Sequence, residues 1–237
     1  MRLTLSRVAA SHGGRLALRG VDLAVPEGGV LAVMGPSGAG KTTLLRVAAL
    51  LHPVESGEVL VDGALPRDAL AARRRMGVVL QRPVALAGTV LDNAAVGLRV
   101  RGVPREEAHA RALPALLRMD LAHVAGRPAR HLSGGELQRL AFVRATLVEP
   151  EILLLDEFTA NLDPANVLAL EAATGAFARQ PGRSVLLCTH DVFQARRLAT
   201  EVAFLRDGSV VERGGREALH APANAWTRGF LAGEVVP

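Results

Sequence analysis

Hydrophobic and polar residues alternate near the start of the chain, as they do in a half-buried β-strand. This period of two covers residues 2–8 and 21–25, and residues 30–34 form a short continuous apolar run typical of a buried strand. The sequence therefore predicts a β-rich opening section.

Further short apolar runs are separated by segments with helical patterns. The runs at 57–61, 77–80, 152–155 and 184–188 predict strands, and residues 42–51 predict a helix. Strands that alternate with helices are typical of a mainly parallel sheet. We therefore predict an α/β fold.

The segment 88–148 contains no convincing strand pattern. Pro104 can start a helix that runs towards Met119, and Ser133 can cap another that runs towards Leu147. The sequence therefore predicts a helical insertion within the α/β unit.

The last part of the chain predicts a hairpin followed by a helical tail. Residues 202–205 and 209–212 flank Asp207-Gly208, a pair that tolerates the positive φ angles of a tight turn. Residues 214–237 predict a short helical tail, which leaves no room for an appended regulatory domain.

Composition limits the classes of protein that remain. A chain of 237 residues, 49% of them hydrophobic, can bury one sizeable core. No apolar run approaches the roughly 20 residues that cross a bilayer, and the N-terminus has no signal-peptide core. We therefore expect the chain to stay in the cytosol.

Charge and aromatic content give little support to nucleic-acid binding. The net charge is +5, but only 3% of the residues are aromatic and tyrosine is absent, whereas single-stranded nucleic acid needs stacking side chains. The only cysteine, Cys188, lies in an apolar run, which predicts a buried and unreactive thiol. We expect a mildly basic, solvated surface and no nucleic-acid partner.

A glycine-rich loop follows the predicted strand at 30–34. Its sequence is Gly35-Pro36-Ser37-Gly38-Ala39-Gly40-Lys41-Thr42-Thr43, which fits the phosphate-binding pattern in its required place between a strand and a helix. The glycines let backbone N–H groups turn towards phosphate oxygens, and the helix N-terminus favours the same negative charge. Lys41 is expected to reach the β- and γ-phosphates of ATP, and the Thr42 hydroxyl to bind Mg²⁺.

Two carboxylates end the predicted strand at 152–155. Asp156 lies where Mg²⁺ needs an acidic partner, at the phosphate edge of a parallel sheet. Glu157 points to the other side of the backbone, so it can act as general base on the attacking water. The pair therefore predicts ATP hydrolysis as well as ATP binding.

A second glycine pair marks the start of the predicted helix at 133. In Leu132-Ser133-Gly134-Gly135-Glu136-Leu137-Gln138-Arg139, Ser133 and Glu136 have the spacing of a capping box. The glycines expose backbone N–H groups beside a helix N-terminus, which predicts a second anion site.

The chain resembles the nucleotide-binding subunits of ABC transporters over nearly its whole length. The resemblance rests on the order and spacing of three segments: the phosphate loop, this Leu-Ser-Gly-Gly-Glu segment and the strand that ends in Asp156-Glu157. The resemblance implies a P-loop NTPase (RecA-like) core with an N-terminal antiparallel β section and an inserted helical subdomain. It also implies a single ABC ATPase domain over 1–237, with its core at 1–82 and 149–237 and the helical subdomain at 83–148.

The family resemblance assigns roles to further residues. Two such subunits pack head to tail, so that Ser133 and Gly135 of one chain close on ATP held by the other. Gln81 matches the residue that senses Mg²⁺ and the attacking water, His190 matches the switch histidine that hydrogen-bonds the γ-phosphate, and Asp163 matches an acidic residue at the dimer interface. Read alone, Asp163 is also a helix N-cap before Pro164.

The expected site therefore has three overlapping sets of residues. The catalytic residues are Glu157, His190, Gln81 and Lys41, and the Mg²⁺ site consists of Thr42, Gln81 and Asp156. The ATP-binding residues are His12, Gly35, Pro36, Ser37, Gly38, Ala39, Gly40, Lys41, Thr42, Thr43, Ser133, Gly134, Gly135 and Asp163.

Two positions depart from the family pattern. The family usually stacks adenine on an aromatic residue near position 12, where this chain has His12, so we expect weaker base stacking. Phe158 occupies a position where proline is common after the acidic pair, which we expect to change backbone stiffness with little effect on the chemistry.

The resemblance also implies partners and a location. Importers of this family place short cytoplasmic helices of an integral-membrane permease in a groove beside Gln81, so residues 82–98 are the expected docking surface. The chain would then be a peripheral subunit on the cytoplasmic face of the cell membrane, linked indirectly to an extracytoplasmic solute-binding protein.

The transported substrate stays open at this point. Residues 159–164 and 190–199 resemble the ATPases of tungstate importers, with molybdate or phosphate importers nearby. An amino-acid importer or a lipoprotein-release exporter remains possible, because the ATPase does not touch the transported solute. A DNA-handling ABC ATPase would need long insertions or fused units, and a switch without hydrolysis would lack Glu157, His190 or Ser133, so both are disfavoured.

Overall fold

The computed structural model describes residues 2–234 and begins with a small antiparallel sheet. Strands β1 (Leu3–His12) and β2 (Arg15–Val25) form a hairpin, and β4 (Ser56–Val61) pairs with the other side of β1. The predicted β-rich opening is confirmed, but both hairpin strands are longer than the segments 2–8 and 21–25.

Irregular pairing explains why the alternating pattern covered only part of the hairpin. Arg7 has a φ of 48°, and the register between β1 and β2 shifts between Leu5 and Val8 and again between Val8 and Ala10. Each shift moves the following side chains to the other face of the sheet and interrupts the period of two. Gly13 and Gly14 both have positive φ, as a two-residue hairpin turn requires.

The main sheet has six strands in the order β5-β6-β7-β3-β8-β9. Neighbours from β5 to β8 run parallel and β9 is antiparallel to β8, so the predicted mainly parallel α/β sheet is confirmed. The strands are β3 (Val30–Met34), β5 (Met76–Val79), β6 (Ile152–Asp156), β7 (Ser184–Thr189), β8 (Glu201–Arg206) and β9 (Ser209–Gly215). Asp207 and Gly208, at φ 48° and 80°, make the predicted turn between β8 and β9.

The strand order places three loops at one edge of this sheet. β7 lies between β6 and β3, with Asp156 opposite Cys188 and Met34 opposite Thr189. The chain therefore leaves all three strands at the same carboxyl edge, where ligand sites of parallel sheets form.

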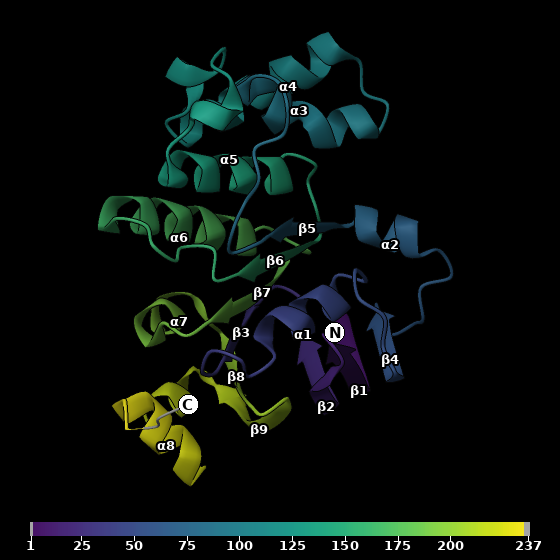
Figure 1. The fold of residues 1–237 in the computed structure, drawn as a ribbon, viewed down its shortest axis with the longest axis vertical. Coiled ribbons are helices and arrows are strands. Elements are labelled where there is room, and N and C mark those ends of the chain that lie inside the picture. Colours follow the sequence, from purple (N-terminus) through teal and green to yellow (C-terminus); the bar gives the residue numbers. More distant parts are fainter. Residues whose placement is uncertain (1, 235–237) are drawn as a thin grey trace.

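Helices cover both faces of the main sheet (Figure 1). Helix α1 (Lys41–Ala48) packs with the antiparallel sheet on one face. The other face is covered by α5 (Gly134–Thr146) and α6 (Pro164–Ala178) beside β6 and β7, and by α7 (Val192–Leu198) and α8 (Ala225–Ala232) beside β3 and β8. Two hydrophobic layers thus hold the carboxyl edge in place.

The insertion between β5 and β6 is helical, as its pattern predicted. Helices α3 (Val90–Val100), α4 (Arg105–Arg118) and α5 share a core of their own, and α5 lies between that layer and α6 (Figure 1). Pro104 and Ser133 stand at the N-caps of α4 and α5. The short helix α2 (Ala69–Arg74) precedes β5 and was not predicted.

The C-terminal region forms a short 3-10 turn at Arg216–Leu219 and then α8, which confirms most of the predicted helical tail. Strand β9 takes up residues 214 and 215, and residues 235–237 lie outside the described residues. No helix within residues 2–234 is long and apolar enough to span a bilayer.

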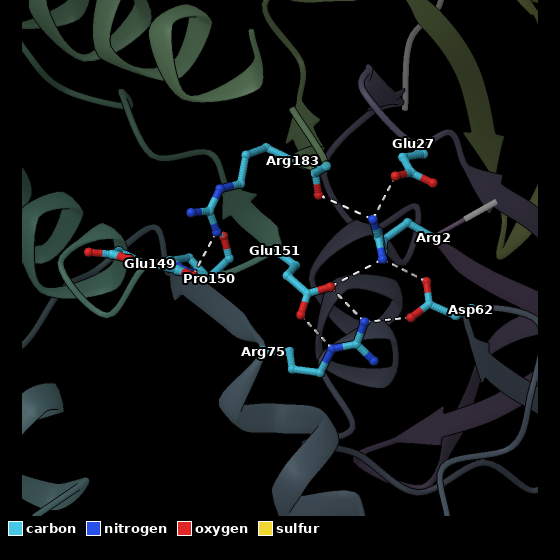
Figure 2. Close-up of polar contacts among 9 residues, drawn as sticks. Arg2, Glu27, Asp62, Arg75, Glu149, Pro150, Glu151 and Arg183 are labelled. Atoms are coloured by element: carbon cyan, nitrogen blue, oxygen red, sulfur yellow. Dashed lines mark hydrogen bonds and ion pairs between the residues drawn. The ribbon is translucent and has the colours of Figure 1, made fainter. Parts of the chain in front are cut away.

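An ion-pair network joins the antiparallel sheet to the amino ends of β5 and β6 (Figure 2). Arg75 donates to Asp62 at 2.5 Å and to both oxygens of Glu151 at 2.8 and 2.6 Å. Arg2 donates to Asp62 at 2.9 Å, to Glu151 at 3.1 Å and to Glu27 at 2.8 Å. The hydrogen bond from Arg75 lowers the pKa of Glu151 below its ordinary value.

Replacing Arg75 should therefore destabilise the fold in a pH-dependent way. A carboxyl group with a lowered pKa stabilises the folded state above its ordinary pKa and loses this effect as the pH falls through the lowered value. Because the partners are partly exposed, we expect Arg75→Met to lower the Tm at neutral pH by only about 2–4 °C.

Thermal unfolding of wild type, Arg75→Met and the control Arg118→Met, an exposed arginine on α4, measures this effect. The Arg75 deficit should shrink once the pH is below the ordinary range of Glu, about 4. An equal deficit at neutral and acidic pH would show that the side chain acts through packing alone.

Candidate functional site

The loop between β3 and α1 has the backbone that a phosphate site needs. Gly40 has a φ of 106°, and a Cβ there would lie 2.5 Å from the carbonyl oxygen of Ala17. A Cβ on Gly35 would lie 2.2 Å from the carbonyl oxygen of Leu205. Only glycine fits either position without a shift of backbone, so the loop lies tightly against β2 and β8 directly before the N-terminus of α1.

Lys41, at the start of α1, lies inside this loop. Its side chain is only 5% exposed, and Nζ donates to the carbonyl oxygens of Gly35 at 2.8 Å and Pro36 at 3.0 Å. The ammonium group also lies 3.3 Å from Oε1 of Glu157. The buried ammonium group of Lys41 is bound by two carbonyl groups and one carboxylate, so it is well placed to bind a negatively charged phosphate.

Glu157 brings the predicted catalytic residues together. Its Oε1 lies 3.3 Å from Nδ1 of His190, and its Oε2 accepts a hydrogen bond of 3.0 Å from Nε2 of Gln81. With Lys41, the other three predicted catalytic side chains therefore all contact the carboxylate of Glu157.

The backbone at Glu157 is held in an unusual conformation. Its φ is 43°, and its N–H donates to the carbonyl oxygen of Cys188 on β7 at 2.9 Å. A non-glycine residue in this region costs on the order of 1–3 kcal/mol, so the surrounding structure must impose it. Cys188 itself is buried, and burial raises the pKa of its thiol well above the ordinary value, as expected for an unreactive cysteine.

Asp156 has the properties of a cation ligand. The residue is 2% exposed, and its Oδ1 has no hydrogen-bond partner within residues 2–234. Burial raises the pKa of this carboxyl group and the charge of Glu157 raises it further, whereas a hydrogen bond from Thr42 lowers it. A buried carboxylate oxygen without a partner next to a threonine hydroxyl fits Mg²⁺, which prefers oxygen ligands and neutralises such a charge.

A cleft of about 490 Å³ adjoins the loop. It is lined by His12, Arg15, Leu16, Ala17, Ser37, Gly38, Gly40, Lys41, Thr42, Thr43, Gln81 and Glu157. Of the remaining predicted ATP ligands, Gly35, Pro36 and Ala39 form the body of the loop, and Ser133, Gly134, Gly135 and Asp163 do not line the cleft.

The start of β2 is the part of the cleft that the sequence did not predict. Arg15, Leu16 and Ala17 line it, and Leu16 is 40% exposed. The tight turn at Gly13-Gly14 brings the start of β2 beside His12. The Gly-Gly pair was therefore the sequence feature that could have predicted this part of the cleft. The ring of His12, which lines the cleft, lies 5.9 Å from the ring of His52, and the two ring planes are tilted by 56°.

The glycine pair after Leu132 starts a well-capped helix away from the cleft. Ser133 accepts from the N–H of Glu136, and Glu136 accepts from the N–H of Ser133 at 2.7 Å, so the predicted capping box is confirmed. This backbone hydrogen bond lowers the pKa of Glu136. Ser133 and Gly134 are exposed, which leaves the helix N-terminus open to a partner.

Asp163 is tied to that same helix. Its Oδ1 caps α6 by accepting from the N–H of Asn166 at 3.0 Å, as its position before Pro164 predicted. The Asn166 side chain donates to Asp163 and accepts from Arg139 of α5. The hydrogen bonds from Asn166 lower the pKa of the exposed Asp163 carboxyl group.

Phe158 has a packing role that the sequence did not reveal. Its side chain is fully buried, and its ring stacks on Phe142 of α5 with 6.5 Å between the centroids. The residue that follows Glu157 is thus packed against α5.

Comparisons with known proteins find similar proteins along most of the chain. The ABC transporter family profile matches residues 18–160. A phosphate import ATP-binding protein of Natronomonas pharaonis is 42% identical over 98% of this chain and 87% of its own length. A probable anion import ATP-binding protein of Haloferax volcanii is 38% identical over 99% and 88%, and a methionine import ATP-binding protein of Thermobifida fusca is 41% identical over 92% and 70%.

Solved structures share the fold. A dimeric ATP-binding cassette in a post-hydrolysis state with ADP and Pi bound has a TM-score of 0.82 at 30% identity, covering 90% of this chain and 98% of its own. The cbiO1 subunit from Clostridium perfringens, part of the transporter complex cbiONQ, has a TM-score of 0.81 at 26% identity, covering 97% and 94%.

The presence of His12 in the cleft predicts weak selection between nucleotide bases. His12 offers a smaller ring than the aromatic residues that usually stack on a base, so we expect the affinities for ATP and GTP to lie within about tenfold, or about 1.4 kcal/mol. Isothermal titration calorimetry of both nucleotides checks this, with His12→Tyr as the comparison that should tighten both. A wild-type preference for ATP far above tenfold would contradict the role given to His12.

Proposed function

Because the chain belongs to the ABC transporter family, we propose that it is the ATP-hydrolysing subunit of an importer and that Glu157 is its general base. The observation that carries the proposal is the contact of Glu157 with Lys41, Gln81 and His190 beside a glycine-rich phosphate loop. The import ATP-binding relatives and the cassette solved with ADP and Pi support it.

Each side chain of the site has its own role in ATP hydrolysis. Lys41 and the N–H groups of residues 35–43 bind the phosphates, and an incoming phosphate competes with Glu157 for the ammonium group of Lys41. Glu157 then accepts the proton of the attacking water, while His190 hydrogen-bonds the γ-phosphate and Gln81 orients the water. The contacts of the Glu157 carboxylate with Lys41, His190 and Gln81 support this assignment.

Asp156, Thr42 and Gln81 are the residues proposed to hold Mg²⁺. The unpartnered Oδ1 of Asp156 within the described part of the chain supports this set. When bound, Mg²⁺ supplies positive charge that offsets the charge of the phosphates. The ion would also remove the cost of a buried carboxylate without a partner.

Two copies of the chain are proposed to form a head-to-tail dimer on ATP. Ser133, Gly134 and Gly135 lie outside the cleft on an exposed helix N-terminus, so they are available to ATP bound by the other copy. Asp163 is joined to this helix through Asn166, which suits a residue of the dimer interface. The dimeric state of a structural neighbour supports this arrangement.

A groove beside the helical insertion fits a membrane permease. It has a volume of about 370 Å³ and lies between α2, β5, α3 and α5, with exposed Leu70 and Val100 at its sides. The groove shares Val96 and Gly97 with the expected docking surface of residues 82–98. From there it continues towards α2. We propose that permease helices dock there and hold the subunit at the cytoplasmic face of the membrane.

The importer is proposed to carry an oxyanion such as tungstate or molybdate. The segments 159–164 and 190–199 support this choice, and the phosphate and anion import relatives have substrates of related chemistry. The alternatives are a phosphate importer, favoured by the phosphate import relative at 42% identity, and an amino-acid importer, favoured by a methionine import relative at 41% identity. Selection of the solute would lie with an extracytoplasmic binding protein, and the helical subdomain at 83–148 would couple the permease to the core at 1–82 and 149–237.

Copurification of the tagged chain with its permease and binding protein, followed by mass spectrometry of the solute on the binding protein, decides the substrate. Bound tungstate or molybdate supports the proposal. Bound phosphate or a bound amino acid would replace it with the corresponding alternative.

The role of Glu157 gives a direct test. Glu157→Gln keeps the shape and the contact with Gln81 but removes the proton acceptor, so steady-state hydrolysis should fall by at least about 10²-fold with ATP affinity retained. Phosphate release and nucleotide titration measure the two effects, with the exposed Glu58→Gln as control. Near-normal turnover in Glu157→Gln would remove Glu157 as the base.

The docking groove gives a second test. Val100 is 75% exposed, so Val100→Asp should leave the fold intact and place a charge where a permease helix would pack. We expect loss of copurification with the permease and unchanged ATP affinity. Leu117→Asp, at an equally exposed leucine on α4, is the control. Retained assembly in Val100→Asp would place the docking surface elsewhere.

A further inference from the structure

A buried polar cluster lies behind the catalytic carboxylate. Gln194 of α7 is fully buried, and its Nε2 donates to Oγ1 of Thr159 at 2.7 Å and to Oε1 of Glu171 at 3.2 Å. Glu171 of α6 is also buried and accepts from Arg197 at 2.6 and 2.8 Å. The cluster thus joins α6, α7 and the loop that follows β6.

Its position relates two catalytic residues to each other. Thr159 follows Glu157 by two residues, and Gln194 follows His190 by four. Asp191 accepts from the N–H groups of Phe193 and Gln194 at 2.7 and 3.1 Å, which fixes the short link between His190 and α7. The hydrogen bond from Gln194 to Thr159 therefore ties the segment of the base to the segment of the histidine, whose side chains lie 3.3 Å apart.

The chemistry of the partners fixes the orientation of the Gln194 amide. An ionised carboxylate such as Glu171 only accepts hydrogen bonds, so it must face the NH₂ group. The amide oxygen then points away, and it has no partner among the described residues. A buried amide with an unpaired oxygen costs on the order of 1–3 kcal/mol, so core packing alone would favour an apolar side chain at this position.

We propose that Gln194 is a positioning residue for ATP hydrolysis. Its amide holds Thr159, and so sets the distance between the carboxylate of Glu157 and the imidazole of His190. This inference rests on the proposed function, because it requires Glu157 to be the base and His190 to act on the γ-phosphate. Gln194 lines no part of the ATP cleft, so its contribution belongs to the chemical step and not to nucleotide binding.

The test compares variants of equal shape. Gln194→Met and Thr159→Val remove the two ends of the hydrogen bond with little change in volume. Small displacements of reacting groups lower rates by up to about 10²-fold, so we expect each variant to lower kcat by about 10- to 100-fold while KM for ATP changes less than about twofold. Gln180→Met, at an exposed glutamine at the end of α6, should behave as wild type.

The double variant separates positioning from general damage. If both residues act through one hydrogen bond, Gln194→Met with Thr159→Val should be no slower than the slower single variant. Tm values are measured alongside, and rates are compared well below the lowest Tm. Wild-type kcat in Gln194→Met, a loss confined to KM, or additive losses in the double variant would each overturn the proposal.

Glu157→Gln in the same assay separates the positioning role of Gln194 from the proposed role of Glu157 as the base. If Glu157→Gln is inactive and Gln194→Met is fully active, the role of Gln194 fails and the proposed function stands. If Glu157→Gln hydrolyses ATP normally, the proposed base fails, and the positioning of that base by Gln194 fails with it.

Discussion

The contact of the Glu157 carboxylate with a buried ammonium group depends on the order of the strands. Lys41 follows β3, Glu157 follows β6 and His190 follows β7, and these groups meet because β7 lies between the other two in parallel register. Distant parts of the sequence thus supply opposite charges at one sheet edge. The hydrophobic layers on the two faces of the sheet hold this edge in place. Packing of the core therefore fixes the positions of Lys41, Gln81, Glu157 and His190.

The loop after Glu157 connects this edge to the rest of the molecule. Phe158 packs on Phe142 of α5, Thr159 bonds to Gln194 of α7, and Asp163 is linked through Asn166 to Arg139 of α5. A change at the catalytic carboxylate can therefore reach the exposed start of α5 within a single chain. In the proposed dimer that helix end faces the ATP of the other copy, so the same contacts would couple the two sites.

Local motifs were sufficient to predict the class of fold and the site residues that meet at the sheet edge. The phosphate loop was recognisable because its glycines and Lys41 occur at the fixed spacing that its backbone conformation requires. The acidic pair was recognisable because it ends a buried apolar strand. The contacts of Ser133 and Asp163 with ATP of a second copy stay predictions.

The remaining features depend on contacts between distant segments. Arg15 and Leu16 were missed because bulges in β1 break the alternation that marks a strand. The ring contact of Phe158 with Phe142 and the bond of Gln194 with Thr159 leave no local pattern, because each joins residues from different elements. The ion-pair network of Arg2 and Arg75 is invisible in the sequence for the same reason.

In the proposed dimer, each ATP site is shared by two copies of the chain. A disulfide between copies tests it directly, because the only native cysteine is buried. In the Glu157→Gln background, a protein with Ser37→Cys and Ser133→Cys should form a cross-linked dimer when ATP is added, while either cysteine alone should not. Cross-linking that is independent of ATP, or equal cross-linking by the single-cysteine proteins, would contradict the head-to-tail site.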